Sequence, residues 1–220
     1  MTSIIRVINP NSNTGVTNGM AEALAPMQFP NGPYFDCVTL TKAPPGIESQ
    51  ADVSTVEPML AELVQADTEA AAFIIGCYSD PGLALCRELT DRPVFGIAEC
   101  AILTALARGS AFGVISILAN SVVRHMRHLR ERLLHLHCAG DRPLGLTVAQ
   151  IESDNDTFSK MVETGKVLRD EDGSNVIILG CAGMARHRTA LEKSLKLPVI
   201  DPTQAAATMA LGTVSLEIKT

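Results

Sequence analysis

Two cysteines each stand at the end of an apolar, β-branched run of residues. Cys77 ends the run AAFIIGC, and Cys181 ends the run NVIILGC. A thiolate is a base or a nucleophile, and a thiol is a weak acid, so a pair of them can remove a proton and return it. Two such groups on opposite faces of one carbon would invert a stereocentre, with the roles of base and acid exchanged in the reverse direction.

The alternative interpretation is that these cysteines are small apolar core residues. The chain has six cysteines in 220 residues and no CxxC pair, and it is too large and core-rich to need a disulfide framework. We therefore predict free thiols throughout. The four other cysteines are interpreted as structural, with Cys100 left open: Cys37, Cys86, Cys100 and Cys138.

An internal repeat distinguishes Cys77 and Cys181 from the four other cysteines. Cys77 matches Cys181 at an offset of 104 residues, the strand ending at Asn9 matches the one ending at Ser116, and PVFGI at Pro93 matches PVIDP. Matches that keep their order at near-constant offset indicate two copies of one structural unit. The two thiols should then be related by a pseudo-two-fold axis.

The elements that must position them alternate between strands and helices. Predicted strands span residues 4–9, 34–40, 71–77, 93–97, 111–117, 143–149, 175–181 and 198–201. Segments of helical period lie at residues 13–27, 54–67, 120–136, 155–171 and 188–196. This alternation predicts an α/β fold of two pseudo-symmetric lobes, each a four-stranded parallel sheet flanked by helices.

Lobe boundaries follow from the repeat. We assign residues 1–98 to lobe 1 and residues 99–202 to lobe 2. The last helix, predicted over residues 203–216, is expected to return to lobe 1, so residues 203–220 join that lobe. Ligands bind beyond the carboxyl ends of parallel strands, which places the active site in the inter-lobe cleft.

Each cysteine precedes a predicted strand-to-helix turn. Ser79 or Asp80 is expected to cap the first of these helices, with Pro81 at its first position. A helix N-terminus lowers the pKa of a thiol and also binds an oxyanion through its free N–H groups. The predicted oxyanion donors are the main-chain amides of Ser79, Asp80, Ala182 and Gly183.

Two polar residues at the ends of the first strand of each copy are further candidates. Asn9 is predicted to turn its amide towards the substrate, with a capping role as the alternative, and Ser116 to present its hydroxyl from the other lobe. The segment NPNSNTG has one glycine and no lysine, so a phosphate loop is not expected. Roles for His187, Glu99 and Asp201 are left open.

The histidines and arginines of RHMRHLRERLLHLHC, residues 124–138, suggest metal or nucleic acid at first sight. Metal motifs need a second paired cluster, which the sequence lacks, so no metal is predicted. The alternation with Val122, Met126, Leu129 and Leu133 predicts an amphipathic helix whose basic residues face solvent.

The composition limits the classes of binding partner that we expect. A net charge of −6 and an aromatic content of 4%, with no tryptophan, argue against nucleic acid. The sequence has no run of about 18 apolar residues, the length that a membrane-spanning helix needs. The apolar segment near residue 4 is too short for a secretory signal. We therefore expect a cytoplasmic protein that acts on a small molecule.

Six motifs occur in order between residue 4 and about residue 212: INPNS, GIES, CYSDPGL, VFGIAECA, GCAGMA and PVIDP. By these motifs the chain resembles the aspartate/glutamate/hydantoin racemase superfamily, and within it the hydantoin and allantoin racemase branch. The resemblance implies a racemase that needs no cofactor, with Cys77 and Cys181 as catalytic residues, and a homo-oligomer.

Several reactions remain open at this stage. A hydantoin ring needs no cationic anchor, and the strand-end loops show few arginines, with Arg186 and Arg188 placed further into a helix. This favours racemisation of 5-substituted hydantoins, allantoin included, over racemisation of free aspartate or glutamate. A decarboxylase on the same fold would need only one thiol. The alternative from another class is a non-catalytic two-lobed protein that binds a small molecule or senses redox state, with thiols of ordinary or raised pKa.

Overall fold

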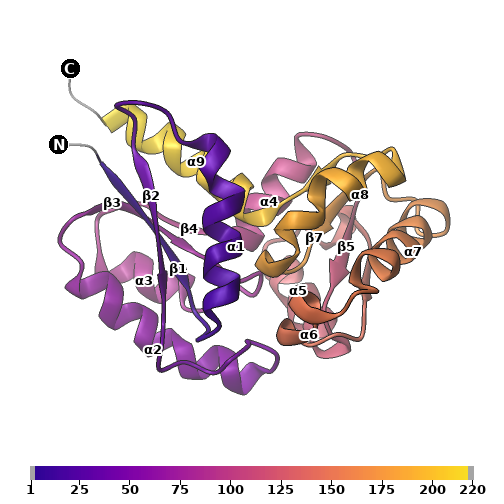
Figure 1. Cartoon of the computed structure of the whole chain (residues 1–220), viewed down its shortest axis with the longest axis horizontal. Helices are drawn as coiled ribbons and strands as arrows, with labels where there is room; N and C mark the ends of the chain where they lie inside the picture. The colour runs from indigo at the N-terminus through magenta and orange to yellow at the C-terminus, as the bar shows by residue number, and fades with distance from the viewer. Residues whose placement is uncertain (1–2, 218–220) are drawn as a thin grey trace.

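The computed structural model describes residues 3–217 and consists of two four-stranded parallel sheets that lie side by side (Figure 1). The first sheet, in the order β2-β1-β3-β4, contains β1 (Ile4–Asn9), β2 (Tyr34–Thr39), β3 (Ala70–Ile75) and β4 (Val94–Gly96). The second, in the order β6-β5-β7-β8, contains β5 (Phe112–Ser116), β6 (Cys138–Pro143), β7 (Val176–Leu179) and β8 (Val199–Ile200). The identical strand orders confirm the predicted pair of four-stranded parallel α/β units.

The central strands are buried on both faces, which explains their continuous apolar runs. Ile5, Val7 and Ile8 of β1 are fully buried, as are all four residues of β7. Helices cover both faces of parallel sheets, so their inner strands carry no polar side. Seven of the eight predicted strands are correct to within two residues at either end.

The sixth predicted strand is wrong. Only Pro143 of the predicted segment belongs to a strand, and residues 144–149 form a loop and the start of a helix, at which Thr147 and Gln150 make a capping box. The true strand is β6, with the polar sequence CAGDRP. It lies at the sheet edge and pairs only with β5, so it needs no apolar run; its Asp141 and Arg142 instead bond to side chains of neighbouring elements.

Helices connect the strands as the periodicity predicts. In the first lobe and at its border they are α1 (Thr14–Leu24), η1 (Ala25–Met27), α2 (Gln50–Ala66), α3 (Leu83–Leu89) and α4 (Ile97–Leu106). The remainder are α5 (Ala119–Glu131), η2 (His135–His137), α6 (Val148–Ser153), α7 (Thr157–Asp170), η3 (Ala182–His187), α8 (Arg188–Leu195) and α9 (Pro202–Glu217). Helix α2 begins four residues before the predicted segment because Ser49 and Asp52 form a capping box.

Helix α9 runs back from the second sheet to the first (Figure 1). It contacts α1, α4, β3 and β4, so the end of the described chain lies against the first sheet. We assign this helix to lobe 1 on those contacts. Residues 218–220 of the segment assigned to that lobe lie outside the described part, as do residues 1 and 2.

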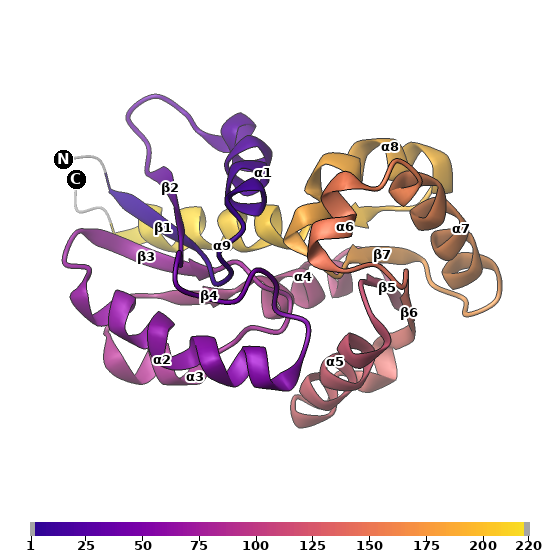
Figure 2. The ribbon, with the colours of Figure 1, turned by 60° about the horizontal axis from the view of Figure 1, so that its bottom comes forward.

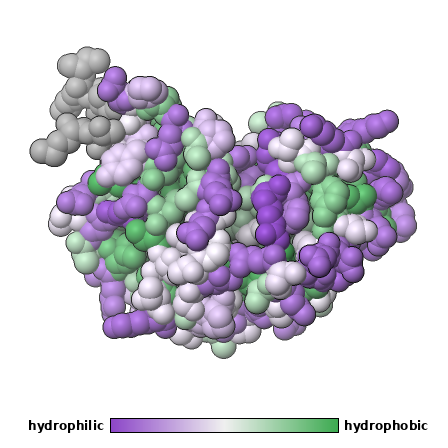
Figure 3. All heavy atoms as spheres, viewed as in Figure 1, coloured by the Kyte–Doolittle hydropathy of each residue, from purple (hydrophilic) through white to green (hydrophobic). Residues whose placement is uncertain are grey.

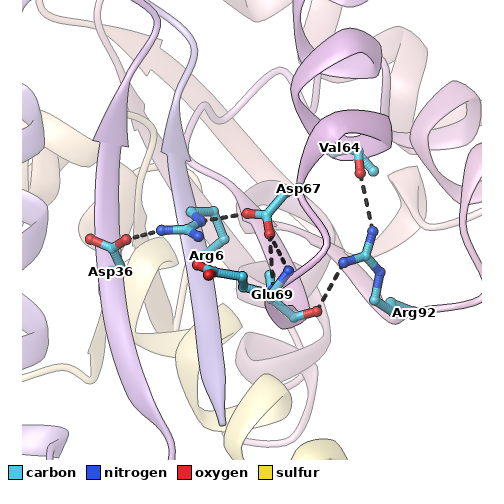
Figure 4. A network of polar contacts seen from close by, with 7 residues as sticks. Arg6, Asp36, Val64, Asp67, Glu69 and Arg92 are labelled. Carbon is cyan, nitrogen blue, oxygen red and sulfur yellow. Dashed lines mark hydrogen bonds and ion pairs between the residues drawn. The ribbon is translucent and has the colours of Figure 1, made fainter.

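An arginine inside the first sheet ties its strands to the end of α2 (Figure 4). Arg6 donates to the carboxylates of Asp36 and Asp67, the latter from Nε at 2.7 Å. Asp67 also accepts the main-chain N–H of Ala70 at 2.9 Å, where β3 begins. These buried and partly buried contacts fix the start of the strand that ends next to Cys77.

The outer surface is largely polar. On the face shown in Figure 3, hydrophilic residues cover most of both lobes and apolar residues gather only in separate patches. Within residues 3–217 we find no helix with the length and apolar content to cross a membrane.

Candidate active site

Each of the two repeat-related cysteines follows a glycine that packs against the neighbouring strand. The N–H of Gly76 donates to the carbonyl of Ile8, and that of Gly180 to the carbonyl of Ile115, both at 2.8 Å. Both cysteines then open a tight turn: the carbonyl of Cys77 accepts the N–H of Asp80, and that of Cys181 the N–H of Met184. The chain therefore delivers both thiols to the sheet ends by the same local structure.

The glycines are required by space. A Cβ on Gly180 would lie 2.7 Å from the Ile115 carbonyl oxygen, and one on Gly76 would lie 3.0 Å from that of Ile8. At Gly180 the close atom is backbone, so the strand end would have to move. At Gly76 the nearest atom is Met20 Sδ at 2.7 Å, so the Met20 side chain would have to move as well. The Gly-Cys pair therefore forms the same local structure in both copies of the repeat.

We expect Gly180→Ala to reduce turnover by about 100-fold, because a displacement on the order of 1 Å of a reacting group costs about that much. The measurement is the initial rate of the reaction that the two thiols are expected to catalyse, with circular dichroism to verify folding. Gly212→Ala in α9 is the matched control, because a Cβ there meets no atom within 4 Å. Equal rates for the two variants would show that the thiol position does not depend on this glycine.

Both cysteines line one small cavity between the sheets, of about 30 Å³. Its walls come from both lobes, with Tyr78 and Ser79 on one side and Ile117, Arg124 and Ala182 on the other. Of the eight candidate residues named from the sequence, four line this cavity: Cys77, Ser79, Cys181 and Ala182. The other four, Asn9, Asp80, Ser116 and Gly183, do not line it.

The expected lowering of the thiol pKa is wrong. Burial raises the pKa of Cys77 to about 11 and that of Cys181 to about 12, which outweighs the N–H bonds that Ser79 and Gly183 donate to the sulfurs. A Cys77 thiolate would further raise the pKa of Cys181, so the two thiols resist ionising together. The carboxylate of Asp80 further raises the pKa of Cys77, and the Arg124 guanidinium lowers it.

Asp80 was expected to present its amide to the substrate or to cap the next helix, and the structure contradicts both. Its amide donates to the Cys77 carbonyl at 2.9 Å, and α3 begins only at Leu83, after Gly82 at φ 64°. Its carboxylate instead accepts the N–H groups of Ala98 and Glu99, both at 2.9 Å. Asp80 therefore caps α4 from a distance, and burial raises its pKa to about 7.

The side chains of Asn9 and Ser116 are fully buried and bonded within the protein. Asn9 donates to Asn13 O at 2.9 Å and to Thr17 Oγ1 at 3.0 Å, so it organises the loop before α1, as its capping alternative implies. Asn11, two residues on, lines the cavity in its place. The predicted ligand contact of Asn9 has no geometric support.

Ser116 belongs to a buried cluster with His125 and Asp141. Its hydroxyl bonds to Asp141 and lies 3.2 Å from His125 Nδ1, the same nitrogen that meets the other Asp141 oxygen at 2.8 Å. A nucleophilic triad needs serine and aspartate on opposite nitrogens of the ring, so this cluster is not one. The ring of His125 packs edge-on to Tyr78 at 4.8 Å and so connects the cluster to the cavity wall.

The expectation that the basic residues of α5 face solvent is wrong for two of them. Arg124 and His125 are only 8% and 5% exposed and line the cavity, whereas Leu133 is 77% exposed. Helix α5 follows β5 at the ligand-binding edge of its sheet, so its first two turns face the other lobe. Arg124 donates across the gap to the Glu48 carbonyl at 3.1 Å. The cleft therefore does contain a cation.

The residues whose roles the sequence left open make contacts outside the cavity that holds the two thiols. His187 stacks on Phe158 at 5.8 Å, Glu99 pairs with Arg87 at 2.6 Å, and Asp201 accepts the N–H of Gln204 at 2.7 Å. Cys100 is buried in the main apolar cluster. No cluster of three or more His, Cys, Asp or Glu side chains within residues 3–217 is arranged to hold a metal ion.

Two pseudo-symmetric α/β lobes with a thiol from each at one shared cavity define a two-lobed protein built to act on a small molecule. The model of the Asp/Glu/hydantoin racemase family matches residues 5–210. The chain is 33% identical to a hydantoin racemase of Paenarthrobacter aurescens over 98% of its length and 93% of that protein, and 33% identical to one of Pseudomonas sp. (strain NS671) over 98% and 88%. An allantoin racemase from Klebsiella pneumoniae superposes with a TM-score of 0.93 at 31% identity, covering 100% of this chain and 90% of the other.

The chain belongs to the Asp/Glu/hydantoin racemase family, in its hydantoin and allantoin branch, as the sequence motifs predicted. It is therefore an enzyme of the isomerase class.

Proposed function

We propose that this enzyme interconverts the enantiomers of 5-substituted hydantoins, allantoin included, by proton transfer between C5 and its two cysteines. The observation that carries the proposal is the pair of Gly-Cys turns that bring Cys77 and Cys181 to one cavity from equivalent strand ends. The hydantoin racemases and the allantoin racemase to which the chain is similar support the substrate class.

In the proposed reaction one sulfur is a thiolate and the other a thiol. The thiolate removes the proton from C5, and the C–H electron pair moves into the ring to form an enolate at the adjacent carbonyl. The opposite thiol then donates its proton to the other face of C5, and the enolate electrons form the new C–H bond. The two cysteines exchange protonation states, and no redox step or cofactor enters this scheme.

Ser79 and Ala182 are the proposed contacts to the ring, because both line the cavity beside the thiols. The N–H groups of Ser79 and Gly183 stabilise the two thiolates. An N–H donor lowers the energy of a buried anion most where water is excluded.

A cavity of about 30 Å³ accommodates roughly one water molecule, so the lobes must separate to admit a ring. Polar contacts between the lobes hold the observed arrangement: Asn13 donates to Glu152 at 3.0 Å, and Glu48 accepts the N–H of Val148 at 2.9 Å. We propose that the lobes close again over the bound ring and exclude water during proton transfer, which strengthens every electrostatic contact at the thiols.

The other function is a non-catalytic one, in which the protein binds a small molecule or senses redox state. The raised pKa values of both thiols are compatible with binding but argue against redox sensing, which needs an accessible thiolate of low pKa. A binding role alone leaves the repeated glycines before the two cysteines unexplained.

The test follows single enantiomers of 5-substituted hydantoins in deuterated water, recording optical rotation and deuterium at C5 above the spontaneous background. We expect enzyme-dependent loss of rotation, with deuterium incorporated at C5. Aspartate and glutamate serve as parallel substrates. Turnover of these alone would replace the hydantoin assignment, and saturable binding without deuterium incorporation would favour the non-catalytic role.

A further inference from the structure

A second, larger cavity of about 220 Å³ adjoins the one that holds the thiols. The two share Tyr78, Ser79, Arg124 and His125 in their walls. The larger cavity lies between α2 and α5, which flank the same side of the gap between the lobes (Figure 2). A ring held between the thiols would therefore direct one substituent into this space.

Arg124 supplies an unused hydrogen-bond donor to this cavity. Its Nη1 donates to the carbonyls of Glu48 and Asn120 at 3.1 and 3.2 Å, and its Nη2 donates to Ser121 Oγ at 3.2 Å. Its Nε is buried and meets no acceptor within residues 3–217. A buried N–H without an acceptor is unfavourable, so a ligand oxygen that accepted from this donor would be stabilised.

His128 supplies a second unused hydrogen-bond donor. Its Nδ1 must accept from Arg132 Nη1 at 3.2 Å, because a guanidinium only donates. Burial lowers the pKa of His128 to about 4, so the ring is neutral at pH 7 and carries its proton on Nε2. That nitrogen is buried, has no partner in the described chain, and lies 3.9 Å from Asp80 Oδ2, too far for a hydrogen bond.

The two donors are arranged to act together. Arg124 and His128 are four residues apart on α5, so their side chains lie on one face of the helix, and both line the larger cavity. The rest of the wall includes polar side chains that suit a hydrophilic group, namely Gln50, Glu57, Arg127 and Glu131.

We propose that Arg124 and His128 bind a hydrogen-bond-accepting oxygen on the C5 substituent of the substrate. They thereby select hydantoins whose substituent carries a carbonyl group, such as a ureido group, over those with an apolar substituent. This proposal rests on the function proposed above, because it requires the ring to lie between the thiols.

The test compares kcat/KM for 5-ureidohydantoin (allantoin) and 5-isobutylhydantoin in the wild type and in Arg124→Met and His128→Leu. We expect the wild type to prefer the ureido compound, and each variant to reduce that preference by on the order of tenfold or more, because the donor discriminates between the substituents. His128→Gln, which keeps a donor, should retain part of the preference. Arg130→Met, exposed on the same helix, is the control and should leave the ratio unchanged.

The ratio is measured within one preparation, so partial misfolding affects both substrates equally. Loss of Arg124 should also slow both substrates, because its charge lowers the pKa of Cys77, but that effect leaves the ratio intact. An unchanged ratio in both variants, or a wild-type preference for the isobutyl compound, would overturn this inference while the racemase proposal stands. Absence of activity on any hydantoin would overturn both.

Discussion

Replacement of Cys77 or Cys181 by serine is expected to reduce racemisation by about 10³-fold, the contribution of one positioned acid or base. A serine hydroxyl does not ionise in the accessible pH range, so each variant loses the base on one face of C5. The remaining thiol still removes the proton from the enantiomer that faces it and returns deuterium to the same face. Each variant should therefore exchange C5 hydrogen in one enantiomer only, and the two variants should prefer opposite enantiomers.

Proton NMR in deuterated water follows the exchange, and polarimetry follows the racemisation. Cys37→Ser is the matched control: burial raises the pKa of this thiol to about 11 as well, but it lies on β2, outside the cavity walls. Racemisation at the wild-type rate in either catalytic variant would remove that thiol from the mechanism. Exchange of the same enantiomer in both would contradict thiols on opposite faces.

The sequence repeat predicted the architecture because both halves bury a parallel sheet between helices and therefore need apolar residues at equivalent positions. A central strand covered on both faces is mostly apolar, so β1, β3, β5 and β7 are recognisable in the sequence. The paired Gly-Cys steps are also recognisable in the sequence: the neighbouring strand leaves no room for a side chain at Gly180, and the Met20 side chain together with the neighbouring strand leaves little room at Gly76.

The edge strand and the inner face of α5 were not predictable from local pattern. Strand β6 pairs on one side only, and its polar residues are satisfied by Ser116, His125 and Asp172, which lie far away in sequence. Arg124 and His125 look like surface residues because their polarity is that of a solvated helix. Only the position of α5 after β5, equivalent to α1 after β1, indicates that its first turns face the cleft.

The direction of the thiol pKa shifts also depended on tertiary structure. A turn that donates N–H groups stabilises a thiolate, as the sequence suggested, and Ser79 and Gly183 do so. Burial between two lobes acts in the opposite direction and is the larger effect. No local motif records how deeply a strand end is covered by the other half of the chain.

These raised values make the rate strongly dependent on pH. The proposed mechanism uses one thiolate, and with the Cys77 pKa at about 11 its thiolate fraction grows about tenfold per pH unit below that value. We expect kcat/KM to rise about 100-fold between pH 7 and pH 9, measured as initial racemisation above background. Cys37→Ser should show the same profile.

The highest pH at which this rate can be measured is set by the stability of the folded protein. The folded-state pKa of each of these two thiols lies above its ordinary value of 9.0, so the native state binds more protons than the unfolded state above about pH 9, and stability falls there as pH rises. Thermal unfolding at each pH therefore accompanies the rate measurement. A rate that is already constant from pH 7 upward would show that bound substrate lowers a thiol pKa far more than Arg124 does in the absence of substrate.

Arg124→Met should move the rise in kcat/KM to still higher pH, because it removes the charge that favours the Cys77 thiolate.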